Sequence, residues 1–318
     1  MAVAGTNHVL YDNFYLSNEI EDQYNSYLDL QTFCQVNNTL EGVPGDTVKI
    51  NVYKATDGVE ELEMGEGNTK SIEVSFAEKE YKIKLAQGRF RYYDEQAMKD
   101  PMLLATGTRH MSVDMFNTVN AKVFEEFNKA KMVIVTNALG FDCFADAQAM
   151  FNFEEVDGMS GFAFVCPADV AKIRKALKDS LQYVEAFARS GYVGTVAGVN
   201  LYAKKDAVPG TVIVATREAV TVFNKRGVSV ERTLENSRSA DDANVRLNTM
   251  FSRKYFTAAL TNEKRAVKVV VGTAAVSADT TVDEDKTYYE KSGLGYVEVT
   301  PATGDNPATK GWYEITAA

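Results

Sequence analysis

The sequence is poor in the side chains that most often carry chemistry. Its 318 residues include only two histidines and three cysteines. Neither His8 and His110 nor Cys34, Cys143 and Cys166 have the spacing of metal ligands. An odd, sparse set of cysteines also argues against a disulfide framework. We therefore expect no metal, no cofactor and no fold held together by disulfides.

Long apolar runs and the common catalytic motifs are also missing. No stretch approaches about 18 uninterrupted apolar residues, so we expect no transmembrane helix and no membrane partner. Residues 1–16 lack a basic region followed by an apolar core, so no secretory signal is expected. GxGxxG, GxxxxGK[ST], HExxH, GxSxG and a CxxC pair are absent. The sequence thus predicts no catalytic residues and no enzyme.

Positive charge is missing from the start of the chain. Lys49 is the first Lys or Arg, and seven acidic residues precede it. Over the whole chain 44 acidic residues outnumber 34 basic ones, for a net charge of -10. A basic arm that condenses RNA or DNA is therefore excluded at this end, and the chain does not coat nucleic acid by bulk charge.

What is present begins with a predicted two-stranded ribbon. Residues 47–53, 70–76 and 80–85 alternate between apolar and polar side chains, which is typical of half-buried strands. The connection over 55–68 contains five acidic residues and no base: Asp57, Glu60, Glu61, Glu63 and Glu66. We expect a long ribbon with an acidic tip. Such a ribbon is marginal in water by itself, so it needs a surface to lie on.

A long helix and a compact α+β unit are expected next. Asp100-Pro101 is a good helix start, and apolar residues three and four apart predict a helix over 108–131. A short buried strand is expected at 132–136, and short strands, including 199–203 and 211–215, with helices over 137–227 form the α+β unit. Strand patterns between 228 and 271, among them 244–253, 256–260 and 266–271, are the natural partners of the long helix. The 137–227 unit is therefore an insertion between the helix and these strands.

Basic residues gather in 225–268, with ten of them against five acidic residues. One interpretation is a solvated face of mixed charge, since most charge excess is simply solvated. The other is a surface that meets acidic patches on neighbouring copies. The residues selected as candidate contacts are Lys225, Arg226, Arg232, Arg253 and Lys254. A hairpin turn is also expected at 225–227.

The C-terminal residues 276–318 differ in composition and predict a small all-β module of three strands rich in tyrosine, with the single Trp312. A piece of this size is near the limit at which a lone core suffices, so it is expected to dock on the main body or on a neighbour. Its aromatic side chains also leave sugar binding open, as in an adhesin.

Four stretches, in this order and spacing, carry a family resemblance across about residues 40–272. They are GDTVKINVYKATDGVEELEMGEGN, FAFVCPADVAKIRKAL, GYVGTVAGVNLYAKKDAVPGTVIVATREAVTVFNKRGVSVE and ANVRLNTMFSRKYFTAALTNEKRAVKVV. The chain resembles the major capsid protein of tailed bacteriophages, of the Hong Kong 97 type.

The resemblance implies an α+β capsid fold with named parts. Residues 1–35 correspond to an N-terminal arm and 36–97 to the extended β-hairpin loop. Residues 98–136 and 228–272 correspond to the peripheral domain with its long spine helix, and 137–227 to the axial domain. The module 276–318 is an addition, expected as a surface decoration.

The resemblance also implies a structural function. Copies are expected to assemble into hexamers and pentamers of an icosahedral head that encloses double-stranded DNA. The location is then the virion capsid, after assembly in the host bacterial cytoplasm. The chain itself is the main partner, with scaffolding, portal and decoration proteins as further candidates and packaged DNA close by without specific contacts. The absence of a long domain before residue 36 suggests separate scaffolding or none.

The properties of the ribbon and of the N-terminal segment agree with this resemblance, and three alternatives stay open. A ribbon that cannot stand alone is explained if it lies on the next copy, with its acidic tip facing basic residues there. A shell filled by a motor after assembly needs no basic arm. The alternatives are an encapsulin-like nanocompartment shell of the same fold, a soluble α/β enzyme, and an adhesin.

Overall fold

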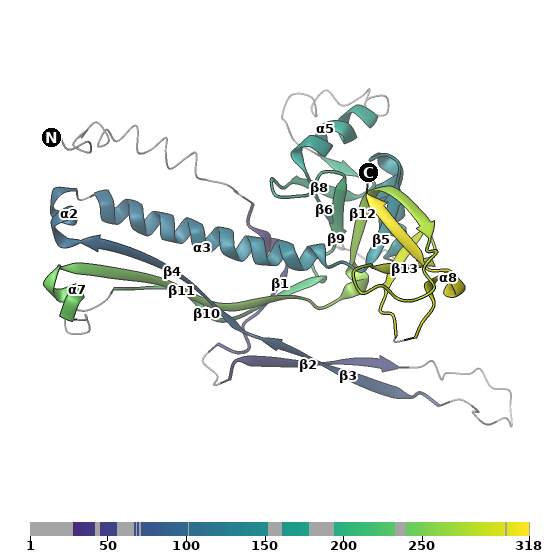
Figure 1. Cartoon of the computed structure of the whole chain (residues 1–318), viewed down its shortest axis with the longest axis horizontal. Helices are drawn as coiled ribbons and strands as arrows, with labels where there is room; N and C mark the ends of the chain where they lie inside the picture. Colours follow the sequence, from purple (N-terminus) through teal and green to yellow (C-terminus); the bar gives the residue numbers. More distant parts are fainter. Residues whose placement is uncertain are drawn as a thin grey trace. The chain divides into compact units, whose positions relative to one another are not determined.

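The structure, a computed structural model, describes residues 28–41, 45–55, 67, 69, 71–100, 102–151, 161–177, 194–232, 240–302 and 304–317. The chain forms two compact units, each assembled from separate stretches of sequence. The first unit comprises 1–35, 112–222 and 258–318, and the second comprises 36–111 and 223–257. Three elements run from one unit into the other: α3 (Met102–Asn128), β10 (Val220–Arg232) and β11 (Leu247–Leu260) (Figure 1).

The first unit contains a nine-stranded sheet of order β15-β13-β14-β5-β12-β9-β6-β8-β7. Its strands are β5 (Met132–Thr136), β6 (Gly161–Val165), β7 (Thr195–Val196), β8 (Val199–Ala203), β9 (Thr211–Ala215), β12 (Ala266–Val276), β13 (Tyr288–Ser292), β14 (Gly295–Val299) and β15 (Tyr313–Ala317). The helices α4 (Phe141–Met150), α5 (Pro167–Ala176) and α8 (Pro307–Lys310) complete it, with a 3-10 turn η4 (Glu263–Arg265). The strands predicted at 132–136, 199–203 and 211–215 are confirmed with these bounds.

Strand β6 lies at the centre of this unit and is buried along its whole length. Ala163 and Val165 belong to the core cluster that includes Phe144 of α4 and Ile173 of α5. Pro167 opens α5, where a missing N–H costs nothing because the first helical N–H groups have no partner within the helix. The sequence FAFVCP thus forms a buried strand followed directly by a helix.

The other side chains of β6 pack against the N-terminal segment and α3. Phe33, in the 3-10 turn η2 (Leu30–Phe33), lies 4.9 Å from Phe162 and 5.4 Å from Phe164 between ring centroids. Phe127 of α3 lies 5.4 Å from Phe164. Asn120 of α3 accepts a hydrogen bond from Leu30 N at 3.1 Å and donates one to Leu28 O at 2.8 Å. Aromatic packing and these two bonds fix the start of the described chain.

The C-terminal strands extend the sheet of the first unit. β15 pairs with β12 from Gly272↔Ala317 to Val276↔Tyr313 and with β13 at Tyr289↔Tyr313. β13 pairs with β14, β14 pairs with β5, and β5 pairs with β12. These pairings close a ring of five strands, two of which, β5 and β12, precede the tail. The three strands were predicted, but their union with the main sheet was not.

Glycines allow the ring to close. A side chain at Gly272 would collide with the backbone of Thr316, and one at Gly295 would meet Val133 O at 2.7 Å and the sulfur of Met150. The ring interior contains Tyr288 beside Trp312, with ring centroids 5.9 Å apart. The segment also contains the short helix α8, which the all-β prediction omitted.

The second unit contains a four-stranded sheet of order β1-β10-β11-β4, with β1 (Gln35–Asn37) and β4 (Lys84–Tyr93) at its edges. Two short helices, α2 (Asp94–Lys99) and α7 (Ala240–Asn244), accompany it. The start of α3 lies against β4, because a side chain at Gly107 would come within 2.5 Å of the Phe90 ring. Gly107 therefore makes room for Phe90 inside one continuous helix, which begins earlier than the predicted residue 108.

Two strand predictions in this unit are corrected. The expected hairpin at 225–227 is absent, since β10 is one strand from Val220 to Arg232. A tight two-residue hairpin turn needs a positive φ, and Gly227 has none. The two strands expected at 244–253 and 256–260 are likewise one strand, β11, preceded by α7.

The ribbon forms a sheet of its own. β2 (Thr47–Ala55) and β3 (Val74–Lys82) pair antiparallel from Thr47↔Lys82 to Ala55↔Val74. Figure 1 shows this pair as a separate two-stranded element. The predicted ribbon is confirmed, with its second strand shifted toward the C-terminus.

Candidate assembly surfaces

The base of the ribbon is attached to the second unit through several contacts. Ile83 N donates to Asp46 O at 2.7 Å, which ties the two strand ends together. The Tyr81 ring stacks on Phe223 of β10, with centroids 5.4 Å apart and planes inclined by 21°. The Lys225 ammonium donates to the carbonyl of Gly45. The ribbon is therefore held at its base by β10.

Farther along, β3 and the residues before it expose large apolar side chains. Ile72, Val74 and Phe76 are 57%, 62% and 67% exposed. They alternate along the chain, and Val74 and Phe76 lie on one face of β3 because side chains of a strand alternate between its faces. A row of such side chains in water marks a contact with another surface more often than chance exposure does.

The acidic candidates of the ribbon tip, Asp57, Glu60, Glu61, Glu63 and Glu66, lie outside the described residues. On the described part of the ribbon, two acidic side chains form ion pairs. Glu78 lies 2.6 Å from the Lys49 ammonium, and Asp46 lies 3.7 Å from that of Lys82. Both pairs are exposed and contribute little to stability.

The basic candidates whose side chains the structure describes have different surroundings. Arg253 contacts Glu231 at 2.7 Å, and Arg226 lies 3.9 Å from the same carboxylate. Lys254 is only 7% exposed, with its ammonium 5.3 Å from the centre of the Phe256 ring. Lys225 holds the ribbon base. Arg232 ends β10, and its side chain is outside what the structure describes.

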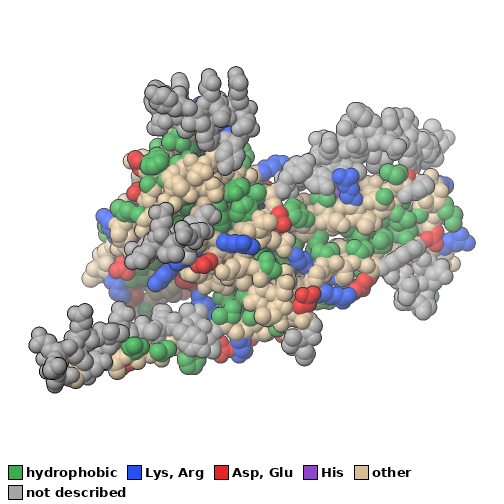
Figure 2. All heavy atoms as spheres, turned by 180° about the vertical axis from the view of Figure 1, so that it is seen from behind, with side chains coloured by type: hydrophobic (Ala, Val, Ile, Leu, Met, Phe, Trp, Pro, Cys, Tyr) green, Lys and Arg blue, Asp and Glu red, His purple; other side chains and the backbone are tan. Residues whose placement is uncertain are grey.

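Basic side chains on the visible face of the molecule are mixed with acidic and apolar ones (Figure 2). Within 225–268, the contacts of Arg226 and Arg253 with Glu231 agree with the solvated, mixed-charge interpretation. A different pair of arginines, Arg89 and Arg91 of β4, was not selected from the sequence. Both are exposed, since the odd-numbered residues of β4 form its solvent face. Continuing the alternating pattern past Leu85 would have indicated them.

Within the part of the chain that the structure describes, reactive and metal-binding groups form no assembled site. Among the described residues, no three His, Cys, Asp or Glu side chains are placed to share a metal ion. Burial, with a smaller contribution from Asp29, raises the pKa of Cys34 to about 12, and burial also raises the pKa of Cys143. A thiol with a raised pKa is a poor nucleophile. Within the described ranges, no helix is long and apolar enough to cross a membrane.

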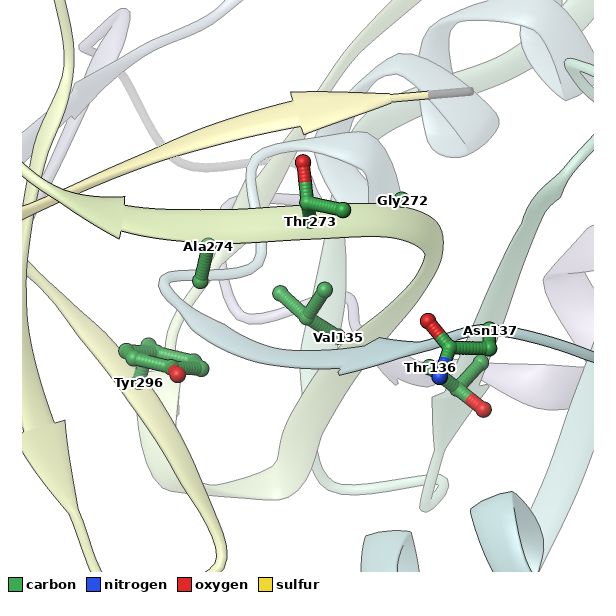
Figure 3. A pocket seen from close by; sticks show the side chains of 7 residues that line it. All are labelled: Val135, Thr136, Asn137, Gly272, Thr273, Ala274 and Tyr296. Atoms are coloured by element: carbon green, nitrogen blue, oxygen red, sulfur yellow. The ribbon is translucent and has the colours of Figure 1, made fainter.

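One open cavity of about 400 Å³ lies where β5 and β12 separate. Its lining includes Thr136 and Asn137 at one end and Tyr296 at the other (Figure 3). The other lining residues are Val135, Gly272, Thr273 and Ala274. None of these side chains is charged, and none is a nucleophile paired with a base. The cavity therefore shows no arrangement for catalysis.

The chain is similar to capsid proteins of bacteriophages. The chain matches no protein-family model. It is 24% identical over 265 residues to the "Major capsid protein" of Staphylococcus phage phiMR11, covering 81% of this chain and 92% of that protein. Among solved structures it is similar to the capsid of cyanophage Pam1, with a TM-score of 0.61 at 8% identity over 78% of this chain and 93% of the other.

A second solved capsid, that of cyanophage P-SCSP1u, gives a TM-score of 0.59 at 12% identity, covering 76% of this chain and 87% of that chain. The ribbon, the long helix and the two units together define the class: this is an α+β shell-protein fold. The fold is that of Hong Kong 97-type phage capsids, and the resemblance to tailed-bacteriophage major capsid proteins is confirmed.

Proposed function

We propose that this chain is the structural major capsid protein of a tailed bacteriophage. Many copies form hexamers and pentamers of an icosahedral head that encloses double-stranded DNA, and the location is the virion capsid. The observation that carries the proposal is the ribbon, whose apolar side chains Val74 and Phe76 stay exposed in a single copy. The capsid fold and the relatives named above support it.

The ribbon explains why a shell forms. A contact between two different surfaces of neighbouring copies repeats around a ring and, with small bends, over a shell. If the ribbon lies on the next copy, each buried side chain such as Ile72 or Val74 contributes about 1.5–3 kcal/mol. Repeated in every copy, this gain offsets the mutual repulsion of chains that each have a net charge of -10.

The domain names of the family apply as part of this proposal. Residues 1–35 are the arm, 36–97 the extended loop, 98–136 and 228–272 the peripheral domain, and 137–227 the axial domain. Contacts inside one chain instead group β5 and β12 with β9. The two descriptions differ because the family names refer to places in a capsomer. The tail 276–318 is proposed to stay attached to the main body and to be presented on the particle.

Partners and assembly site follow from the same proposal. Scaffolding, portal and decoration proteins are the expected further partners, with assembly in the host bacterial cytoplasm and DNA enclosed without specific contacts. We propose no enzymatic role, since the relatives are named as capsid proteins. Those names give an encapsulin-like shell no better support than a phage head. Neighbouring genes for terminase and portal, or for a cargo enzyme, decide between the two.

The test is electron microscopy of the purified chain together with a ribbon variant. The wild-type protein is expected to form hollow closed particles. Ile72→Thr with Val74→Thr keeps β-branched side chains but removes apolar surface, so particle yield should fall steeply. Val208→Thr, at an exposed valine outside the ribbon, is the matched control. A stable, solitary wild-type monomer under all assembly conditions would contradict the proposal.

A further inference from the structure

The solvent face of the second unit's sheet presents two arginines that the structure leaves available. Arg89 and Arg91 are two residues apart on β4, so their side chains emerge on one face about 7 Å apart. Among the described residues, neither arginine has an ion pair or hydrogen bond to an acidic side chain. The candidates chosen from the sequence differ, since Arg253 is paired with Glu231 and Lys254 is buried.

Strand register extends this face onto β11. Arg91 lies opposite Thr249, Arg89 opposite Phe251, and Gln87 opposite Arg253. Directly opposed residues of an antiparallel pair share a face. Arg253 confirms the sharing, because its Nε donates to Gln87 at 3.1 Å and its guanidinium lies 5.0 Å from the centre of the Phe251 ring.

The charge on this face is positive. Among the described residues of β4 and β11 that face this side, the charged ones are Arg89, Arg91 and Arg253, and Glu231 of β10 contacts Arg253 at 2.7 Å. Three guanidiniums of the described residues thus lie on this face with one carboxylate, in a chain whose net charge is -10. A surface of this kind attracts carboxylates, which guanidinium groups bind through two parallel hydrogen bonds.

We propose that Arg89 and Arg91 are the receptor for the acidic segment 57–66 of a second copy. This inference rests on the proposed shell function and assigns a partner to the acidic tip. The segment contains five carboxylates and no base, a denser cluster than the acidic residues before Lys49. The pairing sets the register of neighbouring copies, while the apolar side chains of the ribbon supply most of the contact energy.

Charge reversal and exchange test the pairing. Arg89→Glu with Arg91→Glu, and separately Glu60→Lys with Glu61→Lys, should each lower the yield of closed particles about tenfold, as expected for the loss of a matched charge pair. In an equimolar mixture, contacts between unlike variants pair the native tip with the native arginines or the new lysines with the new glutamates, while contacts between like variants stay mismatched. In the protein with all four changes, the new lysines face the new glutamates at every interface. The four-change protein should recover most of the wild-type yield.

Controls separate the possible outcomes. Lys84→Glu with Lys99→Glu makes the same charge change at two exposed lysines of the same unit and should assemble normally. Arg89→Gln with Arg91→Gln removes charge without adding repulsion, and far-UV circular dichroism of unassembled protein checks that each variant folds. Higher salt should weaken assembly more in the wild type than in the Gln variant, because exposed charges are screened.

Several results would overturn the inference. Normal assembly of the arginine variants would contradict it. A four-change protein that folds but stays unassembled would also contradict it. Binding of a short double-stranded DNA fragment that disappears in the Gln variant would assign the face to phosphates instead. Failure of the wild-type chain to form any particle would refute the proposed function, which the other outcomes leave intact.

Discussion

Two parts of this chain are built from β-strands, and they differ in whether their apolar side chains are buried within one copy. The C-terminal strands join β5 and β12 in a closed ring, which buries Tyr288 and Trp312 inside one copy. The ribbon of β2 and β3 pairs only with itself and leaves Val74 and Phe76 in water. A closed ring has no free edge and needs no partner, whereas a two-stranded ribbon does.

The two regions show that one part of a chain can bury its apolar side chains within a single copy while another part leaves them exposed. A strand set that closes on itself contributes to the stability of the single chain. Strands that pair only with each other keep their apolar side chains exposed until another copy covers them. Changes in the first region are therefore expected to alter unfolding, and changes in the second to alter assembly with little effect on unfolding.

The largest effect on unfolding is expected at Phe164, which is fully buried and contacts rings of η2 and α3. Phe164→Ala removes contacts with Phe33 and Phe127 and leaves a cavity, so it should cost about 3–5 kcal/mol of unfolding free energy. Urea unfolding of unassembled protein, followed by circular dichroism, measures this loss. A cost below about 1 kcal/mol would contradict the described core.

A smaller effect is expected where the C-terminal ring meets the main body. Gly295→Ala places a methyl group 2.7 Å from Val133 O and against Met150, which should destabilise the ring by about 1–3 kcal/mol. Trp312, the single tryptophan, is buried in the ring and reports its opening by a red shift of fluorescence. Gly227→Ala, with open space around the new methyl group, is the control. Equal midpoints for both variants would show that the tail does not pack closely on β5.

Local patterns predicted the elements of this region better than their partners. The apolar run at 132–136 identifies a buried strand because every side chain in it is apolar or β-branched. No local pattern states that Val133 pairs with Tyr296, more than 160 positions later. Sheet partners so distant are set by the whole fold, and so the tail was predicted as a separate module.

Local composition also failed to predict the surroundings of the candidate basic residues. Lys225-Arg226-Gly227 has the composition of a turn, but pairing with neighbouring strands holds it extended within β10. Charge counting selected 225–268, although burial and ion pairing engage Arg253 and Lys254 inside the chain. Composition measures how many charges a segment has, whereas availability depends on neighbours from other segments.

Acid is expected to weaken the ring modestly through Asp279. A hydrogen bond from the Lys286 ammonium, followed by one from the Tyr288 hydroxyl, lowers the pKa of this carboxyl in the folded chain. A group whose pKa is lowered on folding stabilises the fold above its unfolded pKa of about 3.9 and loses this contribution as the pH falls below it.

The Trp312 unfolding midpoint should therefore decline as the pH falls from 5 toward 3, and Asp279→Asn should make that decline shallower. Asp285→Asn, at an exposed carboxylate of the same turn, makes the same change of charge and is the control. Identical pH profiles for the wild type and both variants would remove Asp279 from the forces that hold the ring closed.

The smallest effect on unfolding is expected in the ribbon, where the comparison is sharpest. Ile72→Thr with Val74→Thr changes side chains that are more than half exposed, so the unfolding free energy of the single chain should shift by less than about 0.5 kcal/mol. The same variant should lose most of its particle yield, because its missing apolar area is buried only between copies. Urea unfolding and particle counting on one preparation measure both quantities. A loss of stability comparable to that of Gly295→Ala would mean that the ribbon face is covered by its own chain, and the contrast between the two regions would disappear.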